Sequence, residues 1–297
     1  MPNVDLFSTE EFIYIRQFFE GIDFEVSRLL SDTPDTPEES LTFMLGQLLD
    51  SKTNIHQNLL SYNLKDLNKD LYGSRKRLDI TFETHEHKRH YEGKSKADIG
   101  IILEMKDYNG KKIKKGLLIQ CKRLKYDHKF NLKSKYGLDQ NVKVNSKKID
   151  QLECIRKKEK IDGVKYYYLF YNPLFRSFEE KKDRLAILNY EYFDERVYIR
   201  PGIKASDTNF VEKTRNVVGK KTFTLGEAYE ENQNDIASFF VSFSMFIEHF
   251  LNCNIGIKDF ENQKYLNICS GYGEKDTVKH TLNLKISDVN SQTCNDS

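Results

Sequence analysis

The feature that most constrains the fold is a run of apolar and aromatic residues without a charge, Tyr166-Tyr-Tyr-Leu-Phe-Tyr171. The run follows Lys165 and is stopped by Asn172-Pro173, a pair typical of turns. Because every position is apolar or aromatic, rather than every second one, the pattern predicts a strand buried on both faces. Such a strand is central in its sheet and needs covering layers, so we expect an α/β fold.

The segments before this strand predict two helices and three strands. Residues 8–30 place apolar side chains at helical spacing behind Ser8 or Thr9. A second helix is expected from Thr36 as N-cap, with Pro37 at its first position and Glu39 closing a capping box. The expected strands cover residues 77–84, 96–104 and 116–123, the last two forming a hairpin around Asn109-Gly110.

The remaining segments are assigned more coarsely. Polar residues 126–145 predict a loop, and residues 146–160 predict a helix. After the central strand we expect a strand at 184–190, a helix around 234–252 and a strand at 278–286. The polar residues from Ser287 onwards are expected to be a disordered tail.

The net charge of +2 conceals a partition along the chain. Residues 1–50 contain 2 basic and 11 acidic residues, which gives −9, whereas residues 85–165 contain 23 basic and 11 acidic residues, which gives +12. A concentrated positive field favours binding to a polyanion, because Lys and Arg displace counterions from phosphates. The competing interpretation is a solvated, Lys-rich surface.

Composition excludes several classes of protein. The five cysteines are an odd number without zinc-type spacing, so neither a disulfide scaffold nor a structural zinc site is expected. No basic region followed by an apolar run opens the sequence, and the most apolar stretch, 236–247, is too short to span a bilayer. We therefore expect a cytoplasmic protein without a membrane partner.

Three polar residues of the predicted hairpin carry the chemistry. Asp98 offers an anionic oxygen ligand, Gln120 a neutral carbonyl oxygen and Lys122 a cation for an attacking water or a developing negative charge. A two-residue turn at Asn109-Gly110 pairs positions that sum to 219, which sets Asp98 opposite Cys121; a bulge or a longer turn would instead bring Asp98 onto the face of Gln120 and Lys122. Each residue alone also fits a structural role, and Cys121 is expected in the core.

This arrangement resembles the PD-(D/E)xK nuclease superfamily. Ala97-Asp98 and, further on, Gln120-Cys121-Lys122 are similar to its Mrr-like branch, in which Gln replaces the acidic residue of the ExK element. The helix with Asp150-Gln151-Leu152 and the strand ending at Asn172-Pro173 follow the order of such bacterial nuclease domains, several of them linked to phage defence. Ala97 stands where the family has Pro, and Gln120 removes one negative charge.

The resemblance implies a restriction-endonuclease-like αβββαβ core, with a mixed central sheet flanked by helices and a C-terminal α+β elaboration. The expected domains are an acidic helical segment at 1–35, the nuclease core at 36–175, an extension packed on the core at 176–286 and the tail at 287–297. The implied cofactor is Mg²⁺ or Mn²⁺, and the implied substrate is DNA.

A further acidic ligand is expected from the helix before the hairpin. Counting 100° per residue from the apolar stripe, Glu38 faces inward more than Glu39, so Glu38 is preferred, against the role of an ordinary first-turn Glu. Asp79 and Glu92 are outside candidates. The residues expected to contact the phosphates of nucleic acid are Lys106, Arg123, Lys125, Lys147, Lys148 and Gln151.

The leading hypothesis is a metal-dependent DNA endonuclease in which Asp98, Gln120 and Glu38 hold Mg²⁺ and Lys122 orients the attacking water. A second hypothesis is a non-catalytic nucleic-acid-binding or regulatory subunit, because Gln120 leaves the site less anionic. A third is an effector released by a partner such as an ATPase or another defence-system subunit, its basic middle shielded by the acidic head. A homo-oligomer is compatible with all three.

Overall fold

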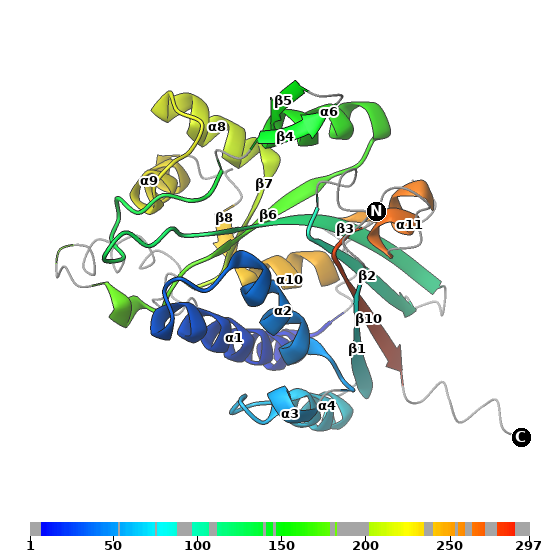
Figure 1. Ribbon diagram of the computed structural model, residues 1–297. Helices are drawn as coiled ribbons and strands as arrows, with labels where there is room; N and C mark the ends of the chain where they lie inside the picture. Colours follow the sequence, from blue (N-terminus) through cyan, green and yellow to red (C-terminus); the bar gives the residue numbers. More distant parts are fainter. Residues whose placement is uncertain are drawn as a thin grey trace, which may run out of the picture. The chain divides into compact units, whose positions relative to one another are not determined.

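The computed structural model describes residues 7–52, 54–74, 76–87, 97–106, 112–138, 141–144, 147–178, 182, 202–234, 240–252, 255–258, 263–270 and 278–288. They fall into two compact units that interleave along the chain. Unit 1 comprises Met1–Ile22, Phe43–Ile119 and Ser244–Ser297, and unit 2 comprises Asp23–Thr42 and Gln120–Phe243. Each unit is mixed α/β, with sheet strands covered by helices (Figure 1).

Four elements have residues in both units. They are α1 (Thr9–Asp32), α2 (Glu38–Leu49), β3 (Lys112–Arg123) and α10 (Phe243–Leu251). The remaining elements of unit 1 are α3 (Asn54–Gln57), α4 (Leu64–Gly73), β1 (Leu78–Glu86), β2 (Ile99–Lys106), β9 (Ile257–Lys258), α11 (Gln263–Cys269) and β10 (His280–Asp288).

Unit 2 has its own set of elements. They are β4 (Asn141–Val144), β5 (Lys147–Asp150), α6 (Gln151–Asp162), β6 (Tyr166–Tyr171), the short 3₁₀ turn η2 (Phe175–Ser177), β7 (Lys204–Asp207), α8 (Thr208–Val218), α9 (Leu225–Asn234) and β8 (Phe240–Ser242).

The sheet of unit 1 has the strand order β1-β10-β2-β3, with β9 on β3. β10 is antiparallel to β1 and parallel to β2, so the sheet is mixed (Figure 1). The last described strand of the chain therefore lies between β1 and β2, which follow one another in the sequence. Its pairing with β1 joins residues about 200 positions apart, which local patterns do not encode.

The outer strand β1 is covered at its free edge by side chains. Asn68 of α4 bonds both backbone groups of Ile80, at 2.8 and 2.9 Å, and the hydroxyl of Ser51 accepts from the backbone N–H of Phe82 at 2.8 Å. Phe82 also packs its ring against Phe18 and Phe19 of α1, with centroids 5.8 Å apart in both pairs. These contacts satisfy an edge that would otherwise expose unpaired backbone groups.

The predicted central strand is confirmed in unit 2. All six residues of β6 are buried, and β6 lies between β3 and β7 in the strand order. Phe170 of β6 contacts the rings of Tyr136, Phe223 and Phe240, with centroids 4.7–6.0 Å apart. Tyr and Phe rings therefore form this part of the core, in a chain without tryptophan.

The hairpin of β2 and β3 is confirmed. The register expected from a two-residue turn is wrong by one residue, and the pairing agrees with the longer-turn alternative. Ile99 pairs with Ile119 and Lys106 with Lys112, so paired positions sum to 218 rather than 219. The reason is the connection: pairing ends at Lys106 and Lys112, so residues 107–111 join the strands, in place of a two-residue turn at Asn109-Gly110. That connection lies outside the described residues.

Several other predictions need correction. The helix expected at 146–160 begins at Gln151, because residues 147–150 form β5. The expected loop at 126–145 contains β4, and the helix expected around 234–252 is replaced at 240–242 by β8 before α10 begins. The hydroxyl of Thr36 bonds the carbonyl of Thr33 rather than capping α2. The strand expected at 184–190 and most of the tail lie outside the described residues.

No helix in the described part of the chain combines the length and apolarity that a membrane crossing requires.

Candidate active site in unit 2

The candidate site begins with a buried lysine at the end of β3. The side chain of Lys122 is 0% exposed, and its Nζ lies 3.7 Å from Oε1 of Glu38. Burying an ammonium group is costly unless a partner offsets its desolvation. The carboxylate of Glu38 supplies part of that compensation.

Glu38 is held at the start of α2 by further contacts. Its Oε2 accepts a hydrogen bond from the backbone N–H of Arg123 at 3.0 Å, and its carbonyl accepts from the hydroxyl of Thr42 at 3.0 Å. The hydroxyl of Thr42 also lies 3.0 Å from that of Tyr171 on β6. The first turn of α2 is thereby fixed to the strands, and Glu38 faces β3, whereas Glu39 is exposed.

The central strand β6 also contacts this region, through Tyr171. The hydroxyl of Tyr171 contacts Sγ of Cys121 at 3.5 Å. Burial, reinforced by Cys121, raises the pKa of Tyr171 well above its ordinary value, so the phenol is neutral at physiological pH. Cys121 is fully buried, which confirms its predicted place in the core.

Gln120 is buried and oriented by a second glutamine. Its Oε1 accepts a hydrogen bond from Nε2 of Gln151 at 2.8 Å, and its own Nε2 donates to the carbonyl of Cys121 at 3.2 Å. Gln120 is 3% exposed and Gln151 is 8% exposed, so the pair is shielded from water. These bonds fix which end of the Gln120 amide is the acceptor.

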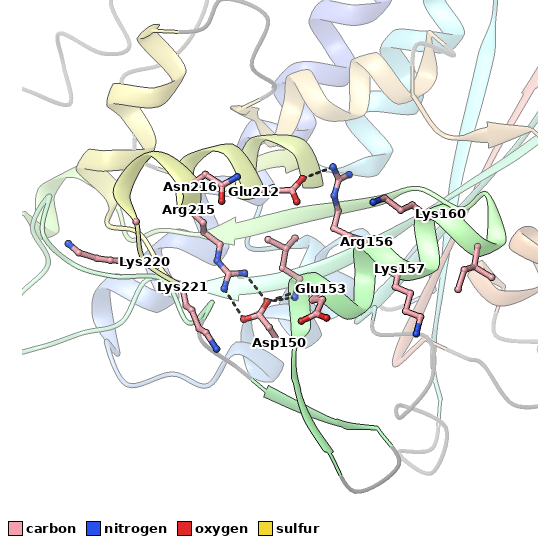
Figure 2. A pocket seen from close by; sticks show the side chains of 13 residues that line it. Asp150, Glu153, Arg156, Lys157, Lys160, Glu212, Arg215, Asn216, Lys220 and Lys221 are labelled. Atoms are coloured by element: carbon pink, nitrogen blue, oxygen red, sulfur yellow. Dashed lines mark hydrogen bonds and ion pairs between the residues drawn. The ribbon is translucent and has the colours of Figure 1, made fainter.

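Gln151 is positioned by the start of α6. The preceding residue, Asp150, is the N-cap and accepts from the backbone N–H groups of Leu152 and Glu153. Both oxygens of Asp150 also accept from the guanidinium of Arg215, at 2.9 and 2.8 Å. Figure 2 shows the pair of Arg215 and Asp150. A chain of contacts therefore runs from Arg215 of α8 through the cap of α6 and Gln151 to Gln120.

The charge of Asp150 is stabilised by this arrangement. Burial alone raises the pKa of Asp150, but the hydrogen bonds and charge of Arg215, together with the backbone N–H groups of Glu153 and Leu152, lower it below its ordinary value. Bidentate pairing of Arg with a carboxylate is among the strongest ion-pair geometries. Sequence reasoning missed this pair because Arg215 is 65 positions away. The start of α6 carried a local signal, since Asp150 and Glu153 match the capping-box pattern.

Asp98 lies in unit 1, one residue before β2. Its backbone N–H donates to the carbonyl of Ile119 at 2.8 Å, and its carboxylate lies 3.1 Å from Nζ of Lys279. Asp98 is 7% exposed. It is described within unit 1, whereas Glu38, Gln120, Lys122 and Gln151 come together within unit 2.

The residues expected to contact phosphates have varied surroundings. Lys106, Lys125 and Lys148 are exposed, whereas the guanidinium of Arg123 donates to the carbonyl of Pro34 at 2.9 Å. Lys147 lies in β5, but its side chain is outside the described residues, as is Glu92. Asp79 lies on β1 of unit 1.

The donor set is chemically suited to a hard divalent cation. Among the described residues, no group of three or more His, Cys, Asp and Glu side chains gathers as a metal site. Glu38 and Gln120 nevertheless offer carboxylate and amide oxygens, the ligands that Mg²⁺ prefers.

Comparisons with protein-family models, with curated proteins and with solved structures found no match to this chain.

Proposed function

We propose that this protein is a metal-dependent endonuclease that hydrolyses phosphodiester bonds of DNA. The observation that carries the proposal is the buried Lys122, held 3.7 Å from the Glu38 carboxylate on the strand that also carries the buried Gln120. A cation, an anionic oxygen and a neutral oxygen ligand within one buried region form a set suited to phosphoryl transfer.

The strand register supports adding Asp98 to this set. In β2 and β3, Gly100 pairs with Leu118 and Ile102 with Gly116. Each even-numbered residue of β2 is therefore paired with an even-numbered residue of β3. Side chains of directly opposite residues in antiparallel strands point to the same face. Asp98 therefore belongs, like Gln120 and Lys122, to the even-numbered positions that share one face of the hairpin. The predicted sum of 219 assigned Asp98 to the opposite face.

Each residue has a proposed task in hydrolysis. Lys122 donates to the attacking water or to a non-bridging oxygen of the phosphate and stabilises the charge that develops there. Glu38 positions the ammonium group of Lys122 and, with Gln120 and Asp98, would hold the cation. Bound Mg²⁺ would supply positive charge to the phosphate and lower the pKa of a coordinated water.

The bond changes of the reaction are simple. One P–O bond forms to the water oxygen, while the bond from phosphorus to the leaving sugar oxygen breaks. The leaving oxygen gains a proton, and the water loses one.

The test is cleavage of supercoiled plasmid DNA with Mg²⁺ or Mn²⁺. Lys122→Ala removes the cation but leaves a cavity, so Lys122→Met serves as a near-isosteric variant and Lys133→Ala as an exposed lysine control. We expect the wild type and the control to cleave, and both Lys122 variants to lose at least about 100-fold in rate. Equal rates in folded Lys122→Met and wild type would refute the proposal.

A second candidate function is a non-catalytic nucleic-acid-binding subunit. The specific observation favouring it is the Gln151 amide bound to Oε1 of Gln120, because this bond occupies one acceptor position of the proposed ligand. Salt-dependent DNA binding without metal-dependent cleavage by the pure protein would favour this candidate.

A further inference from the structure

A cavity of about 780 Å³ opens between α6 and α8 in unit 2. Its lining includes six cationic and three acidic side chains. The cations are Arg156, Lys157, Lys160, Arg215, Lys220 and Lys221. We call this cavity the α6–α8 groove. Glu38, Gln120 and Lys122 are not among its lining residues. Asp150, which precedes Gln151, lines the groove and connects it to the candidate site.

The arginines of the groove are held by carboxylates. Arg215 is paired with Asp150, and one Nη of Arg156 lies 2.6 Å from Glu212 while the other lies 3.0 Å from Glu159. These pairs neutralise the middle of the groove and fix α8 against α6 (Figure 2). They leave the lysines as the source of its net positive charge.

The lysines form two pairs on opposite sides of the groove. Figure 2 shows Lys157 and Lys160, from α6, on one side and Lys220 and Lys221, which follow α8, on the other. All four are exposed, and within the described part of the chain Lys157, Lys160 and Lys221 take part in no ion pair. Lys220 lies 3.8 Å from Glu227, a weak contact.

Separated lysine pairs fit a ligand with several spaced negative charges. A single phosphate can approach one pair, whereas a phosphodiester backbone carries a charge at every nucleotide and can neutralise both. The described residues that line the groove include no aromatic side chain to stack on a base, so the contacts they offer are to the backbone rather than to the bases. Contacts between exposed lysines and phosphates are salt-dependent and reversible, so they allow a bound polymer to slide and dissociate.

We propose that the α6–α8 groove binds the phosphodiester backbone of nucleic acid. The proposal rests on the proposed function in one respect: the polymer in the groove is the substrate of the site at Gln120 and Lys122. The floor of the groove is the Arg215–Asp150 pair, which caps the helix whose first residue bonds Gln120. Substrate held in the groove is thereby held beside the element that orients the site.

The test is fluorescence anisotropy of a labelled DNA duplex in EDTA, so that no cleavage occurs. The groove variant combines Lys157→Ser, Lys160→Ser, Lys220→Ser and Lys221→Ser. The control variant combines Lys65→Ser, Lys69→Ser, Lys133→Ser and Lys285→Ser, four exposed lysines outside the groove with the same total charge. Circular dichroism confirms that both remain folded.

We expect the groove variant to bind at least about tenfold more weakly than the control. The slope of its plot of log K against log salt concentration should be smaller in magnitude by about 3 to 4, since each lost phosphate contact removes about 0.9 from that slope. Equal affinity and slope in the two variants would overturn the proposal. The same series with an RNA duplex identifies the polymer, and a loss with either duplex supports the groove.

Plasmid cleavage by the same proteins separates this proposal from the proposed function. Unchanged DNA binding by the groove variant, together with cleavage that depends on Lys122, would overturn the groove and leave the nuclease standing. Weakened binding without any Lys122-dependent cleavage would support the groove and overturn the nuclease.

Discussion

Nε2 of Gln151 donates to Oε1 of Gln120 at 2.8 Å, a bond between the first residue of α6 and the end of β3. Both side chains are buried, so the bond is shielded from competing water. The bond fixes the acceptor oxygen of Gln120 toward α6 and makes the position of that helix part of the site. Activity is therefore expected to depend on residues that contact neither metal nor DNA.

Replacing Gln151 with Leu should lower both the rate of plasmid cleavage and the free energy of unfolding. The change removes the donor to Gln120 and leaves a buried acceptor unsatisfied, at a cost of about 1–3 kcal/mol in the free energy of unfolding. The rate of plasmid cleavage should fall at least about tenfold, since the Gln120 amide loses its orientation. Glu230→Gln, an exposed change on α9 outside the groove, is the control. Unchanged cleavage by Gln151→Leu would contradict a positioning role.

Replacing Gln120 with Glu should strengthen metal binding. A carboxylate at this position still accepts from Gln151 but adds a negative charge in a residue that is 3% exposed. Without metal, the buried charge should lower the melting temperature, and Mg²⁺ should raise it more than in the wild type. Thermal unfolding with EDTA and with Mg²⁺ measures both effects. A Mg²⁺ response equal to that of the wild type would show that position 120 is not a ligand.

The Asp150–Arg215 pair should stabilise unit 2 in a pH-dependent way. Because the pKa of Asp150 is lowered in the folded state, its contribution is fully present above the unfolded value of about 3.9 and is lost as pH falls through the lower folded value. Asp150→Asn keeps a capping oxygen but loses the charge, whereas Asp150→Ala loses both, at about 1–2 kcal/mol for the cap.

Denaturant unfolding from neutral pH down to about pH 3 tests this expectation. The stability difference between the wild type and Asp150→Asn should shrink as pH falls below the unfolded value. A difference that stays constant over this range would show that Arg215 does not hold the carboxylate in its charged form.

Replacing Gly100 with Ala should disrupt unit 1. A Cβ at this position of β2 would lie 2.1 Å from the carbonyl oxygen of Cys269 at the end of α11, so helix and strand must separate. The cost should be at least about 3 kcal/mol, at the upper end of overpacking effects. Gly73→Ala is the matched control, since nothing lies within 4 Å of a Cβ there. Melting temperatures within about 2 °C of each other would contradict this packing.

Local patterns predicted the elements of the fold better than their arrangement. The uncharged run of β6 identified a central strand, because burial on both faces leaves a composition signal. The place of β10 between β1 and β2 left none, since the pairing of Leu284 with Phe82 and Leu103 joins distant segments. The register of β3 was wrong by one residue because it depended on the length of the turn alone.

Local patterns likewise predicted individual residues of the candidate site better than the contacts between them. Glu38 was preferred over Glu39 from helical spacing, and the structure directs Glu38 toward β3. The Gln120–Gln151 bond depended on where α6 begins, and the expected helix at 146–160 began too early. The groove lysines Lys220 and Lys221 lie outside the basic segment 85–165, so the charge partition did not include them.

Anomalous diffraction from crystals soaked in Mn²⁺ is the decisive measurement, because the proposed function requires that Glu38, Gln120 and Asp98 hold one metal ion beside Lys122. A manganese peak is expected at about 2 Å from an oxygen of each of these three side chains, in wild-type crystals. The same soak of Gln120→Leu crystals should give a much weaker peak. Ordered manganese elsewhere, with no peak at these oxygens in a protein that cleaves DNA, would refute the proposed metal site.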